Sequence, residues 1–159
     1  MLDWYFGSTI RKDIMIKLTK KSSAKRIREA WLEALTSGEY KQGKSYLHQK
    51  TKKGEDRFCC LGVLCDLAVK ARVIDAPEED EDRVVVYDGD AEKLPNSVLD
   101  WAKLKNSTGE PENENFVGEE AWLTKGLKKE SLASLNDAGI KFPTIAKIIK
   151  ENEDVLFYK

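Results

Sequence analysis

The residues best suited to covalent chemistry are two adjacent cysteines, Cys59 and Cys60, and the only histidine of the chain, His48. The cysteines stand where a predicted strand gives way to a predicted helix, and backbone N–H groups at a helix start can lower the pKa of a thiol. A cysteine hydrolase also needs a base, and His48 lies on the neighbouring predicted strand. A cysteine-dependent hydrolase is therefore one hypothesis. We favour the other, in which these thiols pack in the core, because free cysteine is among the most buried residue types.

A second group of residues suits ligand binding. Between residues 40 and 57, basic side chains are interleaved with aromatic and amide side chains, so that an aromatic ring could stack on a base while the cations hold phosphate. The candidate ligand contacts are Tyr40, Gln42, Lys44, Tyr46 and Arg57, together with the polar pair Asn136 and Asp137. Each has a structural alternative. Lysines at a hairpin edge discourage aggregation of sheets, and Asn or Asp at a helix end often bonds local backbone groups.

Two further classes of site are weaker. Short helices predicted over residues 131–138 and 143–152, with Gly139 between them, resemble a helix-turn-helix in outline, which makes a small DNA-binding regulator the third hypothesis. The basic residues of the second helix are all lysines and they have acidic neighbours, whereas a recognition helix presents Arg, Asn or Gln to base edges, backed by basic contacts to phosphate. No cofactor is expected, and no metal, because the cysteines and the histidine match no closed zinc spacing and no EF-hand spacing is present.

Helices must position these candidates. Apolar residues at spacings of three and four predict an amphipathic helix over residues 22–35 and a buried helix over residues 60–71. Gly62, inside the second helix, has no side chain to pack and costs roughly 1 kcal/mol relative to alanine. We therefore expect another element to approach closely at that point. Pro95 begins a further helix, since proline is tolerated in a first turn.

The strands are predicted from shorter patterns. Residues 45–50 and 56–59, separated by a lysine-rich link, predict a two-stranded hairpin with a basic outer side. The valine-rich residues 84–87 are expected to join it as a third strand. Residues 77–82 hold five consecutive carboxylates after a proline, and they predict a solvated loop because such a run repels itself.

Length and composition bound the fold and the compartment. With 159 residues, 41% of them hydrophobic, the chain is long enough for one domain with a core of its own. We expect an α+β fold in which a small antiparallel sheet of about three strands packs against four or five helices. Residues 1–21 are expected to be an N-terminal extension, and residues 22–159 the single domain. No run is long and apolar enough to span a bilayer, which predicts a cytoplasmic protein with reduced thiols and no membrane contact.

Charge is distributed unevenly along the chain. Residues 1–57 carry 14 basic and 7 acidic side chains, whereas residues 58–159 carry 13 and 21. A positive half attracts polyanions, while the acidic half confines such contacts to one face. The charge pattern therefore favours a nucleotide or phosphorylated small molecule as partner, leaving nucleic acid open.

Four blocks of the sequence resemble a known group of proteins. They read WLEALTSGEYKQGKSYL, DRFCCLGVLCDLA, LPNSVLDWAKL and SLASLNDAGIKFPTIAKII, and together they span roughly residues 27–150. They resemble small proteins of unknown function encoded by bacteriophages and by bacterial genomes carrying prophages. The resemblance brings no catalytic residues with it. It implies an accessory phage protein that acts in the bacterial host, by binding either a nucleotide signal of a defence system or a host protein.

These observations lead to one preferred function and two alternatives. We expect a non-enzymatic binding protein whose contacts lie between Tyr40 and Arg57 and at the Asn136–Asp137 turn. The alternatives are the cysteine hydrolase that uses Cys60 or Cys59 with His48, and the DNA-binding regulator. A homo-oligomer is a further expectation, because exposed aromatic residues permit protein contacts.

Overall fold

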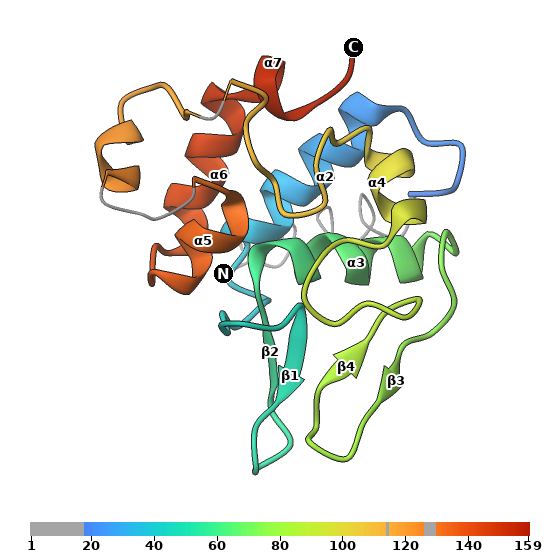
Figure 1. Cartoon of the computed structure of the whole chain (residues 1–159). Helices are drawn as coiled ribbons and strands as arrows, with labels where there is room; N and C mark the ends of the chain where they lie inside the picture. The colour runs from blue at the N-terminus through green and yellow to red at the C-terminus, as the bar shows by residue number, and fades with distance from the viewer. Residues whose placement is uncertain (1–17, 114, 126–129) are drawn as a thin grey trace, which may run out of the picture.

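The protein has an α+β fold in which a group of helices sits above two short hairpins (Figure 1). The computed structural model describes residues 18–113, 115–125 and 130–159. The helices are α2 (Ala24–Thr36), α3 (Cys60–Lys70), α4 (Asn96–Ala102), the 3-10 helix η1 (Ala121–Thr124), α5 (Leu132–Asp137), α6 (Phe142–Glu151) and α7 (Glu153–Leu156). The strands are β1 (His48–Lys50), β2 (Asp56–Phe58), β3 (Glu78–Glu79) and β4 (Val85–Val86). The predicted fold class is confirmed.

Helix α2 forms because its apolar residues fall on one face and a serine caps its start. The Ser23 side chain accepts a hydrogen bond from the backbone N–H of Arg26, which satisfies one of the free donors at the helix start. The buried face of α2 includes Trp31, whose indole N–H donates to the carbonyl of Cys60 at 2.9 Å. This bond ties α2 to the first turn of α3.

Helix α3 is the centre of the core, and Gly62 lets the chain before β1 pack against it. A Cβ atom at Gly62 would lie 1.7 Å from the carbonyl oxygen of Leu47, so only glycine fits. The same carbonyl accepts a hydrogen bond from the backbone N–H of Cys59 at 3.0 Å. The close approach predicted at Gly62 is therefore found, and it fixes the start of the first hairpin against the helix.

The strands differ from the single three-stranded sheet that the sequence predicts. β1 pairs antiparallel with β2, and β3 pairs antiparallel with β4, while one isolated bridge between Gln49 and Val84 joins the two hairpins. β3 comes from the acidic run that was predicted to be a loop. Its residues Glu78 and Glu79 are exposed, so their backbone pairs with β4 while their carboxylates stay in water.

The end of the predicted N-terminal extension packs against the helices. The first 17 of its 21 residues lie outside the described part of the chain. Leu18 is buried in the core cluster, and the carbonyl of Thr19 accepts a hydrogen bond from the indole N–H of Trp101 at 3.0 Å. Residues 18 and 19 thus contact the domain directly.

Candidate anion-binding site

The β1–β2 hairpin ends in a tight turn that carries two lysines. The backbone N–H of Thr51 donates to Glu55 and that of Gly54 donates to Thr51, both at 2.8 Å. Gly54 has a φ of +82°, a conformation that glycine adopts without strain. Lys52 and Lys53 consequently stand exposed at the tip of the hairpin.

The two faces of this hairpin have different chemistry because side chains alternate along a strand. The register pairs His48 with Phe58 on the inner face and Gln49 with Arg57 on the outer face. On the inner face, the rings of His48 and Phe58 stack with their centroids 4.0 Å apart. Arg57 instead reaches solvent from the outer face, where its guanidinium lies 3.0 Å from Glu55.

The β3–β4 hairpin brings one more cation to the first hairpin. The backbone N–H of Lys50 donates to the carbonyl of Arg83 at 2.9 Å, which sets the turn of the second hairpin beside β1. One carboxylate oxygen of Asp80 accepts from the backbone N–H groups of Asp82 and Val84, both at 2.9 Å. The acidic run is thus folded into a turn that ends at the exposed Arg83.

These residues surround an open cleft of about 220 Å³, which we call the hairpin cleft. It is lined by Gln49, Lys50, Thr51, Lys52, Arg57 and Arg83. Pockets that enclose whole drug-sized ligands have about 300–1,000 Å³, so the hairpin cleft has room for one group of a ligand rather than for all of it. Four of its six lining side chains are cationic. Guanidinium and ammonium groups donate charge-assisted hydrogen bonds to phosphate oxygens, which makes this an anion-binding site by its chemistry.

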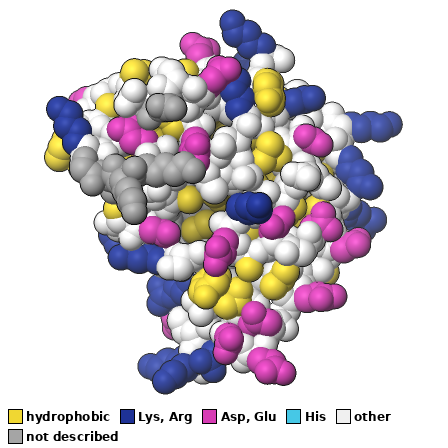
Figure 2. Space-filling view, viewed as in Figure 1, with side chains coloured by type: hydrophobic (Ala, Val, Ile, Leu, Met, Phe, Trp, Pro, Cys, Tyr) yellow, Lys and Arg dark blue, Asp and Glu magenta, His cyan; other side chains and the backbone are white. Residues whose placement is uncertain are grey.

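Two of the four cations of the hairpin cleft are paired with carboxylates, and the other two are not. Lys50 lies 3.3 Å from Glu79, and Arg57 is paired with Glu55, so carboxylates orient these two side chains. Lys52 and Arg83 make no ion pair with any other residue in the described part of the chain. Figure 2 shows basic side chains at the tip of the first hairpin and acidic ones over the second. The positive charge is therefore concentrated at the first hairpin and, apart from Arg83, does not extend over the second.

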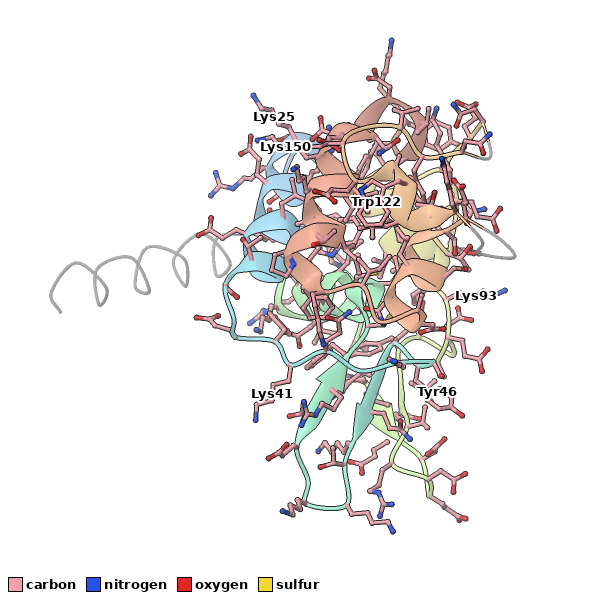
Figure 3. All side chains as sticks on the ribbon, turned by 90° about the vertical axis from the view of Figure 1, so that its left-hand side faces the viewer. Lys25, Lys41, Tyr46, Lys93, Trp122 and Lys150 are labelled. Atoms are coloured by element: carbon pink, nitrogen blue, oxygen red, sulfur yellow. The ribbon has the colours of Figure 1, made fainter. Side chains whose placement is uncertain are left out.

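Arg57 is the one predicted ligand residue that lines the hairpin cleft. Lys44 is exposed at the turn before β1 and Tyr46 is half-buried. In Figure 3, Lys41 and Tyr46 lie on opposite sides of the first hairpin. The structure therefore spreads the predicted basic and aromatic group around the hairpin, and it does not gather that group into one surface.

Tyr40 belongs to a cluster with helix α3. Its hydroxyl donates to the carboxylate of Asp66, and Lys70 contacts both, at 3.2 Å from the hydroxyl and 2.9 Å from the carboxylate. Burial and the neighbouring negative charge of Asp66 raise the pKa of Tyr40 above its ordinary value. Tyr40 also packs edge to face on Phe58. It lines a separate cleft on the inner side of β2, together with Glu39, Glu55 and Asp56.

Gln42, Asn136 and Asp137, three of the predicted ligand contacts, have polar atoms that bond the protein itself. The Asn136 side-chain oxygen accepts from Gln42 at 2.9 Å and from the backbone N–H of Cys60 at 3.1 Å, while its amide donates to the Gly43 carbonyl at 2.7 Å. A carboxylate oxygen of Asp137 accepts from the backbone N–H of Ser45 at 2.8 Å. Asn136 is fully buried. These side chains position residues 42–45, and they offer a ligand little.

The two candidate nucleophiles are buried thiols with internal partners. Cys59 caps α3 and accepts a hydrogen bond from the backbone N–H of Gly62, and the Cys60 thiol donates to the carbonyl of Leu132 at 3.5 Å. Burial raises the pKa of Cys59 to about 11 and that of Cys60 well above its ordinary value. The lowering expected at a helix start is outweighed by desolvation. The geometry favours the packing role of these cysteines.

His48 also has its ring nitrogens engaged elsewhere. Nδ1 lies 2.7 Å from the hydroxyl of Tyr87, and Nε2 lies 2.7 Å from a carboxylate oxygen of Asp56. The Tyr87 side chain is buried, and burial raises its pKa. His48 therefore links the two hairpins through Tyr87. Neither of its nitrogens bonds a described cysteine.

The two helices of the predicted helix-turn-helix exist with nearly the predicted bounds. α5 covers Leu132–Asp137 and α6 covers Phe142–Glu151. α6 buries Ile145, Ile148 and Ile149, and its outward Lys147 is paired with Glu119 at 2.7 Å and with Glu120 at 3.4 Å. Reading of DNA by these two helices stays a prediction.

Sequence reasoning missed Arg83. Its neighbours in sequence are acidic, so the local pattern predicts repulsion of anions. Only the long-range contact between β1 and the second hairpin places it beside Arg57. A lone arginine at the end of an acidic run was the available signal, and it does not predict a position in space.

The described residues contain neither a metal-binding group nor a membrane-spanning helix. Within residues 18–113, 115–125 and 130–159, no group of three or more His, Cys, Asp or Glu side chains is placed to hold a metal ion. Among the helices of this same part of the chain, none has the length and apolar character needed to cross a membrane.

Comparison with known proteins gives one match. A family model described as "Domain of unknown function (DUF8296)" matches residues 23–153, a stretch that contains both hairpins and every residue of the hairpin cleft. No curated protein and no solved structure matches the chain. Because the matched stretch is most of the sequence, the chain belongs to the DUF8296 family of domains of unknown function.

Proposed function

We propose that this protein is a non-enzymatic binding protein that holds the phosphate group of a nucleotide, or of another phosphorylated small molecule, in the hairpin cleft. One observation carries the proposal: Lys50, Lys52, Arg57 and Arg83, from two separate hairpins, converge on one cleft. Two of these four cations, Lys50 and Arg57, are paired with carboxylates, whereas Lys52 and Arg83 add positive charge that no described carboxylate offsets. An anion offsets that charge, which favours binding.

The ion pairs at the cleft fit this role. Glu55 and Glu79 hold Arg57 and Lys50 in place without consuming all of their donors, because a guanidinium has five N–H donors and an ammonium has three. Arg83 and Lys52, which have no ionic partner among the described residues, supply the uncompensated charge. The site is thus partly ordered before the ligand arrives, and this lowers the entropy cost of binding.

Two considerations favour binding over catalysis and suggest a setting. The cysteines that would serve as nucleophiles are buried and hold internal hydrogen bonds. The resemblance to phage and prophage proteins suggests a setting in which a small accessory protein withdraws a nucleotide signal from a bacterial defence system. Sequestration needs affinity for the ligand and no turnover.

Isothermal titration calorimetry with three probes tests the proposal. Pyrophosphate and ADP should bind, adenosine should not, and the affinity of ADP should fall as KCl is raised because salt screens the cleft. The variant Arg83→Ala should weaken ADP by about tenfold or more, corresponding to loss of a charge-assisted contact.

Lys93→Ala is the matched control, since it removes one exposed positive charge outside the cleft. It should bind ADP like the wild type. The proposal is wrong if neither pyrophosphate nor ADP binds, if adenosine binds as tightly as ADP, or if Lys93→Ala weakens ADP as much as Arg83→Ala does.

A further inference from the structure

A second surface runs between helices α2 and α6. It shares no lining residue with the hairpin cleft. It is a groove of about 630 Å³, which we call the α2–α6 groove. Glu153 of α7, which is paired with Arg28 at 3.1 Å, contributes to the lining of the groove. Along α2 the groove is lined by Glu29, Leu32, Glu33 and Thr36, and along α6 by Pro143, Ala146, Lys147 and Lys150. Both sets follow the spacing i, i+3, i+4, i+7, so each helix contributes one continuous stripe. Grooves between two such stripes accept another helix surface.

The two stripes carry opposite charge. The α2 stripe is acidic through Glu29 and Glu33, and the α6 stripe is basic through Lys147 and Lys150. Leu32, Pro143 and Ala146 add apolar side chains to the lining of the groove. Glu29 and Lys150 are exposed and make no ion pair elsewhere in the described chain. Both charges are therefore available to a partner.

We propose that the α2–α6 groove is the interface of a homodimer, with a second copy of this chain as its occupant. A two-fold axis requires a surface that is complementary to itself. Rotation by 180° about an axis that runs along this groove lays the acidic stripe of one copy over the basic stripe of the other, and the apolar side chains of the two copies meet in the same interface. A partner of one charge sign would be attracted by one stripe and repelled by the other.

An exposed aromatic side chain extends the same face. Trp122 in η1 is 63% exposed, and it follows Glu119 and Glu120, whose carboxylates contact Lys147 at the groove wall. Figure 3 shows Trp122 and Lys150 on the face turned toward the viewer, with α6 between α2 and η1. Stable interfaces bury about 1,200–2,000 Å² in total and are enriched in tryptophan. The groove and Trp122 together supply an apolar centre with a charged rim.

The oligomeric state of the full chain tests this proposal directly. Sedimentation velocity of the wild type, at protein concentrations from about 1 to 100 μM, should show a monomer converting to a dimer, a range typical of micromolar affinity. Two variants reverse one stripe each: Glu29→Lys with Glu33→Lys, and Lys147→Glu with Lys150→Glu. Each variant alone should be monomeric over this range, because like charges then face each other across the axis.

Mixing the two variants separates loss of an interface from loss of the fold. Each variant presents two stripes of one sign, so the equimolar mixture should form a heterodimer that neither forms alone. The control is Lys93→Glu with Lys159→Glu, which makes the same change in net charge as Lys147→Glu with Lys150→Glu, at exposed positions outside the groove. It should dimerise like the wild type.

A wild type that stays monomeric at every concentration would overturn the proposal and leave the groove to a different chain. So would reversal variants that still dimerise, or a mixture of folded variants that forms no heterodimer. A melting curve for each variant establishes that it is folded. None of these outcomes depends on nucleotide binding, so the dimer and the proposed function stand or fall separately.

Discussion

The polar cluster around Asn136 and the hairpin cleft both include residues of the stretch 42–57, and they use their hydrogen-bonding groups in opposite ways. Asn136 bonds Gln42, Gly43 and Cys60, and all three bonds are internal. Arg83 and Lys52 in the hairpin cleft have no ionic partner among the described residues. Both regions contain residue types that bind ligands. A polar residue is therefore a good ligand candidate only where the fold leaves its donors unused.

Among the residues that serve the fold, substitution of Gly62 by alanine should cause the largest loss of stability. The new Cβ would lie 1.7 Å from the Leu47 carbonyl oxygen, so β1 or α3 must move, at a cost of about 3 kcal/mol or more. Urea denaturation measures this loss in the free energy of unfolding. Helix propensity by itself predicts the opposite sign, a gain of about 1 kcal/mol. A variant more stable than the wild type would show that the close approach is not rigid.

Asn136→Ala should come next. It leaves the buried N–H of Cys60 without its acceptor and releases the Gly43 carbonyl, and a lost buried partner costs about 1–3 kcal/mol. The companion variant Asp137→Ala removes one exposed bond to Ser45 and should cost less than about 1 kcal/mol. If the two variants lose equal stability in urea, then the buried bonds of Asn136 contribute no more to folding than the exposed bond of Asp137 does.

Alkaline pH should weaken the protein through its buried thiols. Burial raises the pKa of Cys59 from 9.0 to about 11, so above pH 9 the unfolded chain releases this proton while the folded chain retains it. The unfolded state then binds fewer protons, and the free energy of unfolding falls between pH 9 and 11 by about 2 kcal/mol from this group.

The variant Cys59→Ala isolates that contribution. Its stability should fall less steeply than that of the wild type between pH 9 and 11, whatever its starting stability. Equal slopes for the two proteins in urea titrations at each pH would mean that the Cys59 thiol ionises as easily in the folded state as in the unfolded one. That result would return Cys59 to the candidates for a reactive nucleophile.

The cleft variants should show the smallest effect on stability and so complete the comparison. Arg57→Ala combined with Arg83→Ala removes side chains that reach solvent, and exposed ion pairs contribute about 0–1 kcal/mol. We expect a change of less than about 1 kcal/mol in urea, together with loss of ADP binding. A large loss of stability would place these arginines with Asn136, as residues that serve the fold.

Local patterns predicted most of the elements. Helices α2, α3, α5 and α6 follow from apolar spacing, and the β1–β2 hairpin from short strands around a lysine-rich link. The second hairpin was only half predicted, because β3 consists of two exposed glutamates. Strands pair through backbone groups, which every residue has. A row of charged side chains therefore gives no pattern from which the strand can be predicted.

The candidate site was predicted less well, and the reason is geometric. Arg57 was found because its own segment is basic. Arg83 was missed because it belongs to a different hairpin. The hydrogen bond from the backbone N–H of Lys50 to the carbonyl of Arg83 places it beside the cleft. Conversely, Gln42 and Asn136 were expected to meet a ligand. Their residue types are right for that role, but the fold brings these two residues, 94 positions apart in the sequence, together so that they bond each other.

The sequence alone determined the α+β class, the buried helix centred on residues 60–71, the need for a close approach at Gly62, and the basic character of the first hairpin. These follow from side-chain size, period and charge, which are local properties. The tertiary structure decided which polar groups are left for a partner. That choice depends on hydrogen bonds between residues far apart in the chain, because a donor is free only when no distant acceptor has been folded against it.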